Sequence, residues 1–345
     1  MQVMGTGLAG QQFDGGPVAP GQCVRIMTGA VMPDGLDTVV PQEFVKVEGN
    51  QVRVPAGVVR TGDNRRLAGE DLAQGEAALT AGRVLRPADL GLLASLGQAE
   101  VPVLRRLRVA FFSTGDELRS IGEPLGAGCV YDSNRYTLWG MLQRLGVDLI
   151  DLGVVRDEPA ALEAAFRSAA DSADAVITSG GVSVGEADHT KQVMASLGDV
   201  LFWRIAMRPG RPMAIGRIRN GAKADDGNGA ILFGLPGNPV AVMVTFYAFV
   251  RDALLAMSGT AASPLPMLRA ASVEAIRKKP GRTEYQRGIV ARAPGGEWQV
   301  RITGSQGSGI LRSMSEASGL VVLHHEQGNV EVGGLVDVLP FDGLV

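Results

Sequence analysis

The sequence is poor in the residues that several kinds of chemistry require. Among its 345 residues are two cysteines, three histidines and 5% aromatic residues. Because Cys23 and Cys129 lack CxxC spacing, they cannot form a disulfide framework, and we expect a reducing compartment, the cytoplasm. Three histidines leave little scope for a Ser/His/Asp or Cys/His catalytic set. The few aromatic rings argue against a surface on which nucleic-acid bases stack.

Strong net charge and long apolar runs are also missing. The net charge is −3 and the isoelectric point is near 5.7, which argues against a general nucleic-acid surface or an anionic membrane as partner. No signal-peptide pattern is visible, and no apolar run reaches the ~18 residues of a membrane span. The longest candidate, residues 240–257, contains Arg251 and Asp252 and is predicted to be a buried helix. We therefore expect small-molecule partners, without nucleic acid or membrane.

The chain is long enough for two to four domains, and its hydrophobic share of 46% is typical of globular proteins. Residues 1–72 show short alternating runs between glycine and proline turns, which predicts a β-rich domain. Its predicted strands are residues 22–26, 38–42, 44–48 and 51–54. No strand or helix is predicted at Met1, so we expect this domain to be incomplete at its start. A connecting segment, 73–106, contains a predicted helix over residues 87–97, with proline in its first turn and glycine at its end.

Residues 107–260 change character, because strand patterns alternate with helix patterns. This alternation predicts a multidomain α/β protein whose centre is a doubly wound, mostly parallel sheet with helices on both faces. Residues 265–345 return to short alternating strands separated by glycine and proline turns, which predicts a β barrel or sandwich. The predicted central strands are 109–112, 149–154, 175–178, 201–205, 213–218 and 231–233, with helices at 133–145, 158–170, 190–197 and 239–258; the C-terminal strands are 268–273, 285–290, 298–302, 319–323 and 335–339.

The most informative stretch is DAVITSGGVSVGEADHTK, residues 174–191. A buried strand runs into Gly180, Gly181 and Ser183, and a helix pattern follows the acidic residues. A glycine turn between strand and helix can offer backbone N–H groups to a phosphate, at the sheet edge where open α/β folds hold ligands. A plain connection, with glycines for packing, explains the loop alone equally well.

Carboxylates follow three of the predicted central strands. Glu117 follows the first, Asp157 the second and Asp188 the third. Because the carboxyl ends of parallel strands share one edge, these groups can converge and hold Mg²⁺ against a phosphate. Helix capping is the alternative for Asp157, Glu158 and Asp188.

Two further segments suit an anion. The turn LPGNP, with Pro236, Gly237, Asn238 and Pro239, is rigid and starts a long apolar helix that Asn238 can cap. The segment FWRIAMRPGRP places Arg204 and Arg208 beside the predicted edge, where guanidinium groups suit an oxyanion. A solvated basic loop is the alternative for these arginines.

Together these motifs resemble the MoeA-type molybdopterin molybdenumtransferases, a family that includes the E domains of gephyrin and of the plant Cnx proteins. The matching segments follow one another almost from end to end. They are RIMTGAVMPDGLDTVV (25–40), RLAGEDL (66–72), STGDEL (113–118), YDSNR (131–135), TSGGVSVGEADHTK (178–191), FWRIAMRPGRP (202–212), GLPGNPV (234–240) and GSQGSGIL (304–311).

The resemblance implies insertion of molybdate into adenylylated molybdopterin with release of AMP, in the presence of Mg²⁺. It implies a central molybdopterin-binding, MogA-like domain, a lasso-type N-terminal domain, a C-terminal barrel, and a homodimer that shares its site between subunits. MogA-like adenylyltransferases and downstream cofactor carriers are implied protein partners. By position, the implied catalytic residues are Asp71, Glu117, Asp157 and Asp188, of which the last three bind metal; the binding residues are Thr28, Thr114, Gly180, Gly181, Ser183, Arg204, Arg208, Pro236, Gly237, Asn238, Pro239, Arg282 (with Arg287 as the alternative) and Ser308.

The chain departs from the family pattern in three respects. Arg204 and Arg208 stand where lysines are frequent, and Ala241 stands where many members have serine. The family's opening helix and DGYA-type motif are absent, so we expect an N-terminally truncated chain. The rival functions are a MogA-like adenylyltransferase, a CinA-like nucleotide hydrolase and a non-catalytic gephyrin-like scaffold. Flanking β domains disfavour the first two, and the lack of a fused second domain disfavours the scaffold.

Overall fold

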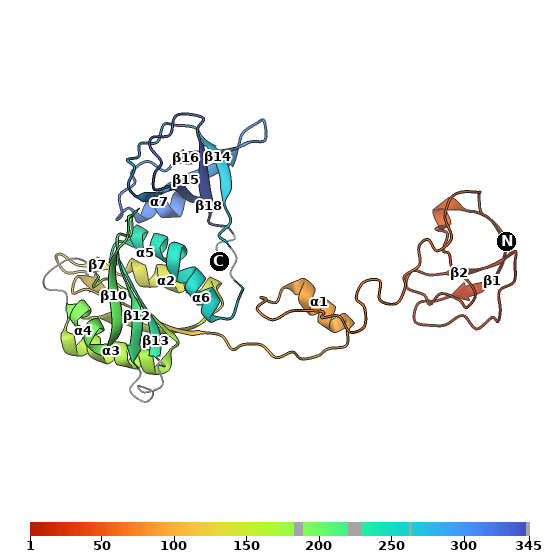
Figure 1. Cartoon of the computed structure of the whole chain (residues 1–345), viewed down its shortest axis with the longest axis horizontal. Coiled ribbons are helices and arrows are strands. Elements are labelled where there is room, and N and C mark those ends of the chain that lie inside the picture. Colours follow the sequence, from red (N-terminus) through yellow and green to blue (C-terminus); the bar gives the residue numbers. More distant parts are fainter. Residues whose placement is uncertain (183–188, 220–228, 262–263, 343–345) are drawn as a thin grey trace. The chain divides into compact units, whose positions relative to one another are not determined.

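The structure is a computed structural model that describes residues 1–182, 189–219, 229–261 and 264–342. Its contacts divide the chain into two compact units, Met1–Thr80 and Ala81–Val345. The division falls within the segment 73–106 that the sequence predicts to be connecting. Figure 1 labels elements of both units.

The first unit has a small sheet with the strand order β2-β1-β4-β3. The strands are β1 (Gln2–Gly7), β2 (Gln22–Ile26), β3 (Lys46–Glu48) and β4 (Gln51–Arg53). Two predictions were wrong. The chain starts with a strand, because β1 pairs in parallel with β2 and the Met1 amine donates to the Val52 carbonyl at 2.8 Å. Residues 38–42 are not a strand, since Pro41 has no N–H for a ladder and is followed by the 3₁₀ turn η1 (Gln42–Phe44).

In the second unit, helix α1 (Pro87–Ser95) precedes a six-stranded sheet with the order β10-β12-β13-β9-β5-β8. Pro87 opens α1, and Gly97 just beyond its end has a φ of 71°, as predicted for a glycine C-terminus. In the sheet, β13, β9, β5 and β8 are parallel, and β12 pairs antiparallel with β10 and β13. The strands are β5 (Arg108–Thr114), β8 (Asp148–Val155), β9 (Ala175–Ser179), β10 (Gly198–Arg204), β12 (Pro212–Arg219) and β13 (Gly229–Leu235).

Helices cover both faces of this sheet, as the sequence predicts (Figure 1), and alternate residues of its inner strands supply two separate cores. On β5, Phe111 packs in the core with α2 (Ser133–Arg144), and Phe112 packs in the other core with α3 (Pro159–Ser172). The rings of Phe112 and Phe166 meet edge to face at 5.1 Å between centroids. Helix α4 (His189–Leu197) joins α3 on its face. Short strands β6 (Leu118–Arg119) and β7 (Val130–Tyr131) pair beside α2 and were not predicted.

The long apolar helix after LPGNP has three parts, α5 (Pro239–Thr245), a π-helical turn η2 (Phe246–Val250) and α6 (Arg251–Met257). Among the described residues, this is the single helical stretch long and apolar enough to cross a membrane. Val240, Val244, Phe246 and Leu254 are buried in the core that it shares with α2. Its apolar character is therefore explained by packing inside the fold, which confirms the predicted buried helix.

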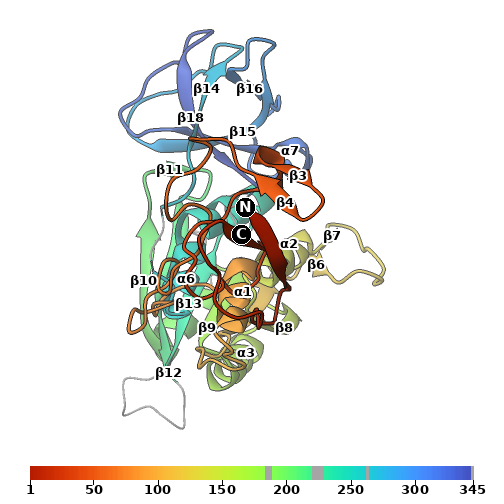
Figure 2. The same cartoon turned by 90° about the vertical axis from the view of Figure 1, so that its right-hand side faces the viewer.

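A closed barrel follows, and it packs against the same long helix (Figure 2). Strands β15, β16, β14, β18 and β17 pair in a ring that β17 closes onto β15, and β11 (Met207–Arg208) pairs with β15 from outside. Tyr247 of η2 stacks on Phe341 at 6.0 Å. The prediction of a C-terminal barrel is thus confirmed. The barrel elements are β14 (Leu268–Ser272), β15 (Thr283–Arg292), β16 (Trp298–Ile302), β17 (Gly319–Leu323), β18 (Leu335–Pro340) and the unpredicted helix α7 (Leu311–Glu316).

Candidate functional site

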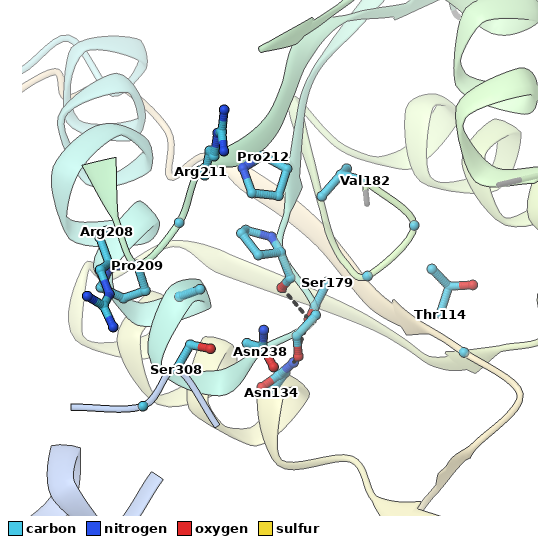
Figure 3. A pocket seen from close by; sticks show the side chains of 18 of the residues that line it. Thr114, Asn134, Ser179, Val182, Arg208, Pro209, Arg211, Pro212, Asn238 and Ser308 are labelled. Carbon is cyan, nitrogen blue, oxygen red and sulfur yellow. Dashed lines mark hydrogen bonds between the residues drawn. The ribbon is translucent and has the colours of Figure 1, made fainter. Parts of the chain in front are cut away.

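A cavity of about 830 Å³ lies at the carboxyl edge of the central sheet. It is bounded by the ends of β5, β9 and β13, by the turn between β11 and β12, and by a barrel loop. This is the position where open α/β sheets hold ligands, and the volume lies in the range of pockets for cofactor-sized ligands. Figure 3 shows Arg208 and Ser308 at one side of the cavity and Thr114 and Val182 at the other. The predicted residues that line it are Thr114, Glu117, Asp157, Gly180, Gly181, Arg208, Pro236, Gly237, Asn238, Arg282 and Ser308.

The glycine turn after β9 needs glycine for steric reasons. Gly180 and Gly181 have φ values of 97° and 66°, in the region that disfavours other residues. A Cβ on Gly180 would lie 2.5 Å from the Thr114 carbonyl oxygen, and one on Gly181 would overlap the Thr190 side chain. However, the Gly180 N–H already donates to the Leu235 carbonyl at 3.1 Å. The expectation that this amide holds a phosphate is therefore wrong for Gly180. Its hydrogen bond instead joins the glycine turn to the end of β13, where the proline turn LPGNP begins.

The proline turn after β13 lies beside the glycine turn at the edge of the cavity. Pro236 is buried, whereas Gly237 and Asn238 are exposed to the cavity. Asn238 occupies the N-cap position of α5, but its side chain makes no capping hydrogen bond, so the predicted capping role was wrong. Pro239 is the first residue of α5 and does not line the cavity. The exposed amides of this turn are left available to an anion at a helix start.

Asn134, in the first turn of α2, joins the two turns and was not singled out from the sequence. Its Nδ2 donates to the Ser179 hydroxyl at 2.8 Å and to the Gly237 carbonyl at 2.7 Å (Figure 3). Because the Gly237 oxygen can only accept, the amide orientation is fixed, and the buried Oδ1 is left without a hydrogen-bond donor. The motif YDSNR offered a signal: Asp132 is the N-cap of α2, which places Asn134 at the start of the helix.

Positively charged side chains line the cavity. Arg208, Arg211 and Arg282 all line it. Among the described residues, Arg208 and Arg211 have no hydrogen-bonded or ion-paired carboxylate. Arg204 ends β10, is exposed and does not line the cavity. Arg208 lies on β11, beside the barrel strand that follows Arg282, so these two guanidinium groups favour a ligand with concentrated negative charge, such as an oxyanion.

Arg287 has a different role from Arg282, although the sequence left the choice between them open. Arg287 is fully buried and donates from Nε to the Ser313 hydroxyl at 2.9 Å and from Nη2 to the Gly307 carbonyl at 2.9 Å. Burial, with repulsion from Arg208, lowers its pKa to about 10. Arg287 thus holds the loop that leads to Ser308. The Ser308 carbonyl in turn accepts from the Val240 N–H at 3.1 Å, which ties this loop to the start of α5.

Carboxylates lie on the other side of the cavity. Glu117 is exposed beyond the end of β5, and Asp157 is half-buried beyond β8. Asp157 accepts from the Thr190 hydroxyl at 3.3 Å, and Glu158 is the N-cap residue of α3 but makes no capping hydrogen bond. No group of three or more metal-ligand side chains occurs among the described residues. Two predicted site residues, Ser183 and Asp188, lie outside the described residues.

The remaining predicted site residues, Thr28 and Asp71, belong to the first unit. Thr28 lies in the turn after β2, and Asp71 lies in a bend that follows RLAGE. Both are exposed, so both are available to a ligand or to another protein surface.

The doubly wound sheet, its glycine turn and the cavity at its carboxyl edge define the class of molybdopterin-binding domains. Residues 110–256 match the family model described as "Probable molybdopterin binding domain". Residues 3–97 match "MoeA N-terminal region (domain I and II)", and residues 269–341 match "MoeA C-terminal region (domain IV)". The chain belongs to the MoeA family of molybdopterin molybdenumtransferases and has a role in molybdenum cofactor biosynthesis.

Individual relatives give the same assignment. The molybdopterin molybdenumtransferase of Haemophilus influenzae is 40% identical over the whole chain, which spans 84% of that protein. The molybdopterin molybdenumtransferase of Nostoc is 38% identical over 88% of the chain and 69% of its own length. The crystal structure of the molybdopterin biosynthesis MoeA protein of Pyrococcus horikoshii superposes with a TM-score of 0.78 at 27% identity, over 99% of this chain and 81% of that one.

Proposed function

We propose that this protein inserts molybdate into adenylylated molybdopterin and releases AMP. The observation that carries the proposal is the charge arrangement of the cavity. Arg208 and Arg282 lie on the barrel side of the cavity, Arg211 lines it from the turn between β11 and β12, and Glu117 and Asp157 line it beyond the ends of β5 and β8; the glycine turn and the proline turn line it as well. A ligand with a metal oxyanion at one end and a pyrophosphate at the other matches this arrangement.

Each wall has a distinct part in the proposed reaction. Arg208, Arg282 and the Ser308 hydroxyl bind molybdate, a tetrahedral dianion that accepts hydrogen bonds from guanidinium and hydroxyl groups. The amides of Gly181 and Gly237 face the phosphates, since neither has a backbone partner among the described residues. A water oxygen then attacks the phosphorus of the AMP phosphate, the molybdopterin phosphate leaves as this bond breaks, and AMP is released without a covalent enzyme intermediate.

We propose Mg²⁺ as the cofactor, bound by Glu117, Asp157 and Asp188. The fit is supported by Asp157, whose side chain has one long hydrogen bond at 3.3 Å and therefore keeps most of its lone pairs free. Mg²⁺ typically takes one or two carboxylates, with substrate phosphate oxygens and water completing its shell, so a larger protein cluster is not required. The ion supplies charge neutralisation at the pyrophosphate.

The decisive experiment incubates the protein with adenylyl-molybdopterin, Mg²⁺ and molybdate and measures AMP release. We expect the Asp157→Ala/Asp188→Ala variant to lose at least 100-fold in rate, the usual scale for removal of an electrostatic catalytic group. Glu158→Ala is the matched control, because Glu158 neighbours Asp157 but is absent from the cavity wall. Full AMP release by the double variant would refute the metal role.

We further propose a cytoplasmic homodimer in which Thr28 and Asp71 of one subunit complete the cavity of the other. Both are exposed in the first unit, and both free cysteines, Cys23 and Cys129, suit a reducing compartment. Asp71→Ala and Asp157→Ala homodimers should each be inactive, and mixed dimers should regain one intact site. Failure of mixing to restore AMP release, with dimers demonstrated by sedimentation, would contradict a shared site.

The rival activities are separated by their substrates. An adenylyltransferase consumes ATP when given free molybdopterin, whereas the proposed enzyme does not. A scaffold releases no AMP from adenylyl-molybdopterin. MogA-like adenylyltransferases and downstream cofactor carriers are the protein partners that we propose, as supplier of the substrate and acceptors of the product.

A further inference from the structure

One acidic side chain is buried directly behind the basic wall of the cavity. Glu284, the second residue of β15, is 4% exposed. Its Oε1 accepts from Arg282 Nε at 3.0 Å, and its Oε2 accepts from Gln286 Nε2 at 3.3 Å. A buried carboxylate is costly unless it is paired, so the position of this group is strongly tied to Arg282.

The register of the strands places Glu284 beneath the cavity arginines. In the parallel pair of β11 and β15, Arg208 lies opposite Glu284. The adjacent Thr283 N–H donates to the Ala206 carbonyl at 2.9 Å, which fixes the barrel strand to the segment that carries Arg208. Glu284 is therefore part of the rigid β framework and is not a mobile surface carboxylate.

The contact with Glu284 uses a particular nitrogen of Arg282. Nε is the inner nitrogen of the planar guanidinium, so a bond at Nε fixes the plane of the group and leaves Nη1 and Nη2 at its outer end. Within the part of the chain that the structure describes, these two nitrogens have no protein acceptor. The Arg282 side chain is 43% exposed, and without the carboxylate a long side chain at this exposure would sample many rotamers.

We propose that Glu284 is a positioning residue that holds the Arg282 guanidinium with its two outer nitrogens presented to the oxyanion in the cavity. This rests on the proposed function for the identity of the oxyanion, molybdate. Gln286 completes the arrangement, because its amide holds the second carboxylate oxygen. The Arg282 side chain is already ordered in the folded protein, so less conformational entropy is lost when the ligand binds.

A Coulombic role alone gives the opposite expectation. Removal of a negative charge behind a basic wall would strengthen the binding of a dianion. Loss of a positioning contact would weaken it. The sign of the change in molybdate affinity therefore separates the two roles.

The test measures binding of sodium molybdate to the full chain by isothermal titration calorimetry. We expect Glu284→Ala to weaken binding five- to tenfold and Glu284→Gln, which keeps an acceptor for Nε, to stay within about threefold of the wild type. Arg282→Gln should also weaken binding, and Glu284→Ala added to it should cause no further loss, because the two residues act as one unit. Glu316→Ala is the control, since Glu316 pairs with Arg312 at 2.7 Å in an exposed ion pair outside the cavity.

Kinetics give a second readout. In the molybdate-dependent release of AMP, the KM for molybdate should rise in Glu284→Ala, with kcat at saturating molybdate unchanged. Tighter binding by Glu284→Ala, or an equal loss of affinity when Glu284→Ala is added to Arg282→Gln, would overturn the positioning role.

If the wild type binds no molybdate, the proposed function fails as well. If Arg282→Gln weakens binding and the Glu284 variants do not, this inference alone fails. Should Glu284→Ala not fold, the comparison of Glu284→Gln with Arg282→Gln and with the double Gln variant decides the same question.

Discussion

Removal of the Asn134 side chain should uncouple the two turns that border the cavity. Asn134→Ala deletes the bonds from Nδ2 to the Ser179 hydroxyl and to the Gly237 carbonyl, at 2.8 and 2.7 Å. Asn134 is 7% exposed, so water replaces these bonds poorly. At about 1 to 1.5 kcal/mol for each net hydrogen bond, the loss in the free energy of unfolding is about 2 to 3 kcal/mol. The unpaired Oδ1 disappears with the same change, which offsets part of that loss.

The assay is urea denaturation followed by circular dichroism, with the shift of the midpoint converted to free energy at an unchanged slope. Asn238→Ala is the matched control in the same cavity wall, because the Asn238 side chain makes no capping bond and is exposed. We expect that control to stay within about 0.5 kcal/mol of the wild type. An Asn134→Ala midpoint indistinguishable from that of Asn238→Ala would show that Asn134 does not join the turns.

Three more predictions concern the same unit. Gly180→Ala should destabilise the protein by more than about 1 kcal/mol in thermal unfolding, since its φ is 97° and its Cβ would lie 2.5 Å from the Thr114 carbonyl oxygen; an unchanged unfolding temperature would contradict this. Arg105 lowers the pKa of Asp174, so this ion pair stabilises the fold fully above the unfolded value of about 3.9 and loses its effect as pH falls through the lower folded value. The stability gap between the wild type and Asp174→Asn should therefore close below about pH 4, and a gap that widens in acid would refute it. Arg287→Met should raise the KM for molybdate by disordering the loop before Ser308, whereas unaltered kinetics would show that this loop needs no buried guanidinium.

Local sequence patterns predicted most elements because their information is local. The predicted bounds of strands β16 and β17 are those of the structure, and α1 begins at the predicted proline. Elements that depend on distant pairing were missed. Strand β1 contains Gly5 and Gly7, which weaken a strand pattern, and it exists because β2 and β4 provide its hydrogen bonds. Strand β11 is two residues long and exists because β15 lies beside it.

The candidate site shows the same division. The motifs identified the glycine turn, the proline turn and the arginine segment, and residues from all three line one cavity. The sequence did not show that Asn134 bonds to Gly237, 103 positions further along the chain, or that Glu284 is buried behind Arg282. It also left Arg282 and Arg287 equivalent, although the first lines the cavity and the second is fully buried among loop carbonyls.

The sequence by itself determined the order of elements, the α/β centre between two β regions, the family and the residue types of an anion site. These properties follow from short-range periodicity, turn chemistry and motifs, which are carried by neighbouring residues. Only the tertiary structure decided which side chains share the cavity and which hold others in place. Hydrogen bonds across β11 and β15, and from α2 to the proline turn, join residues that no local pattern links, since packing alone brings them within bonding distance.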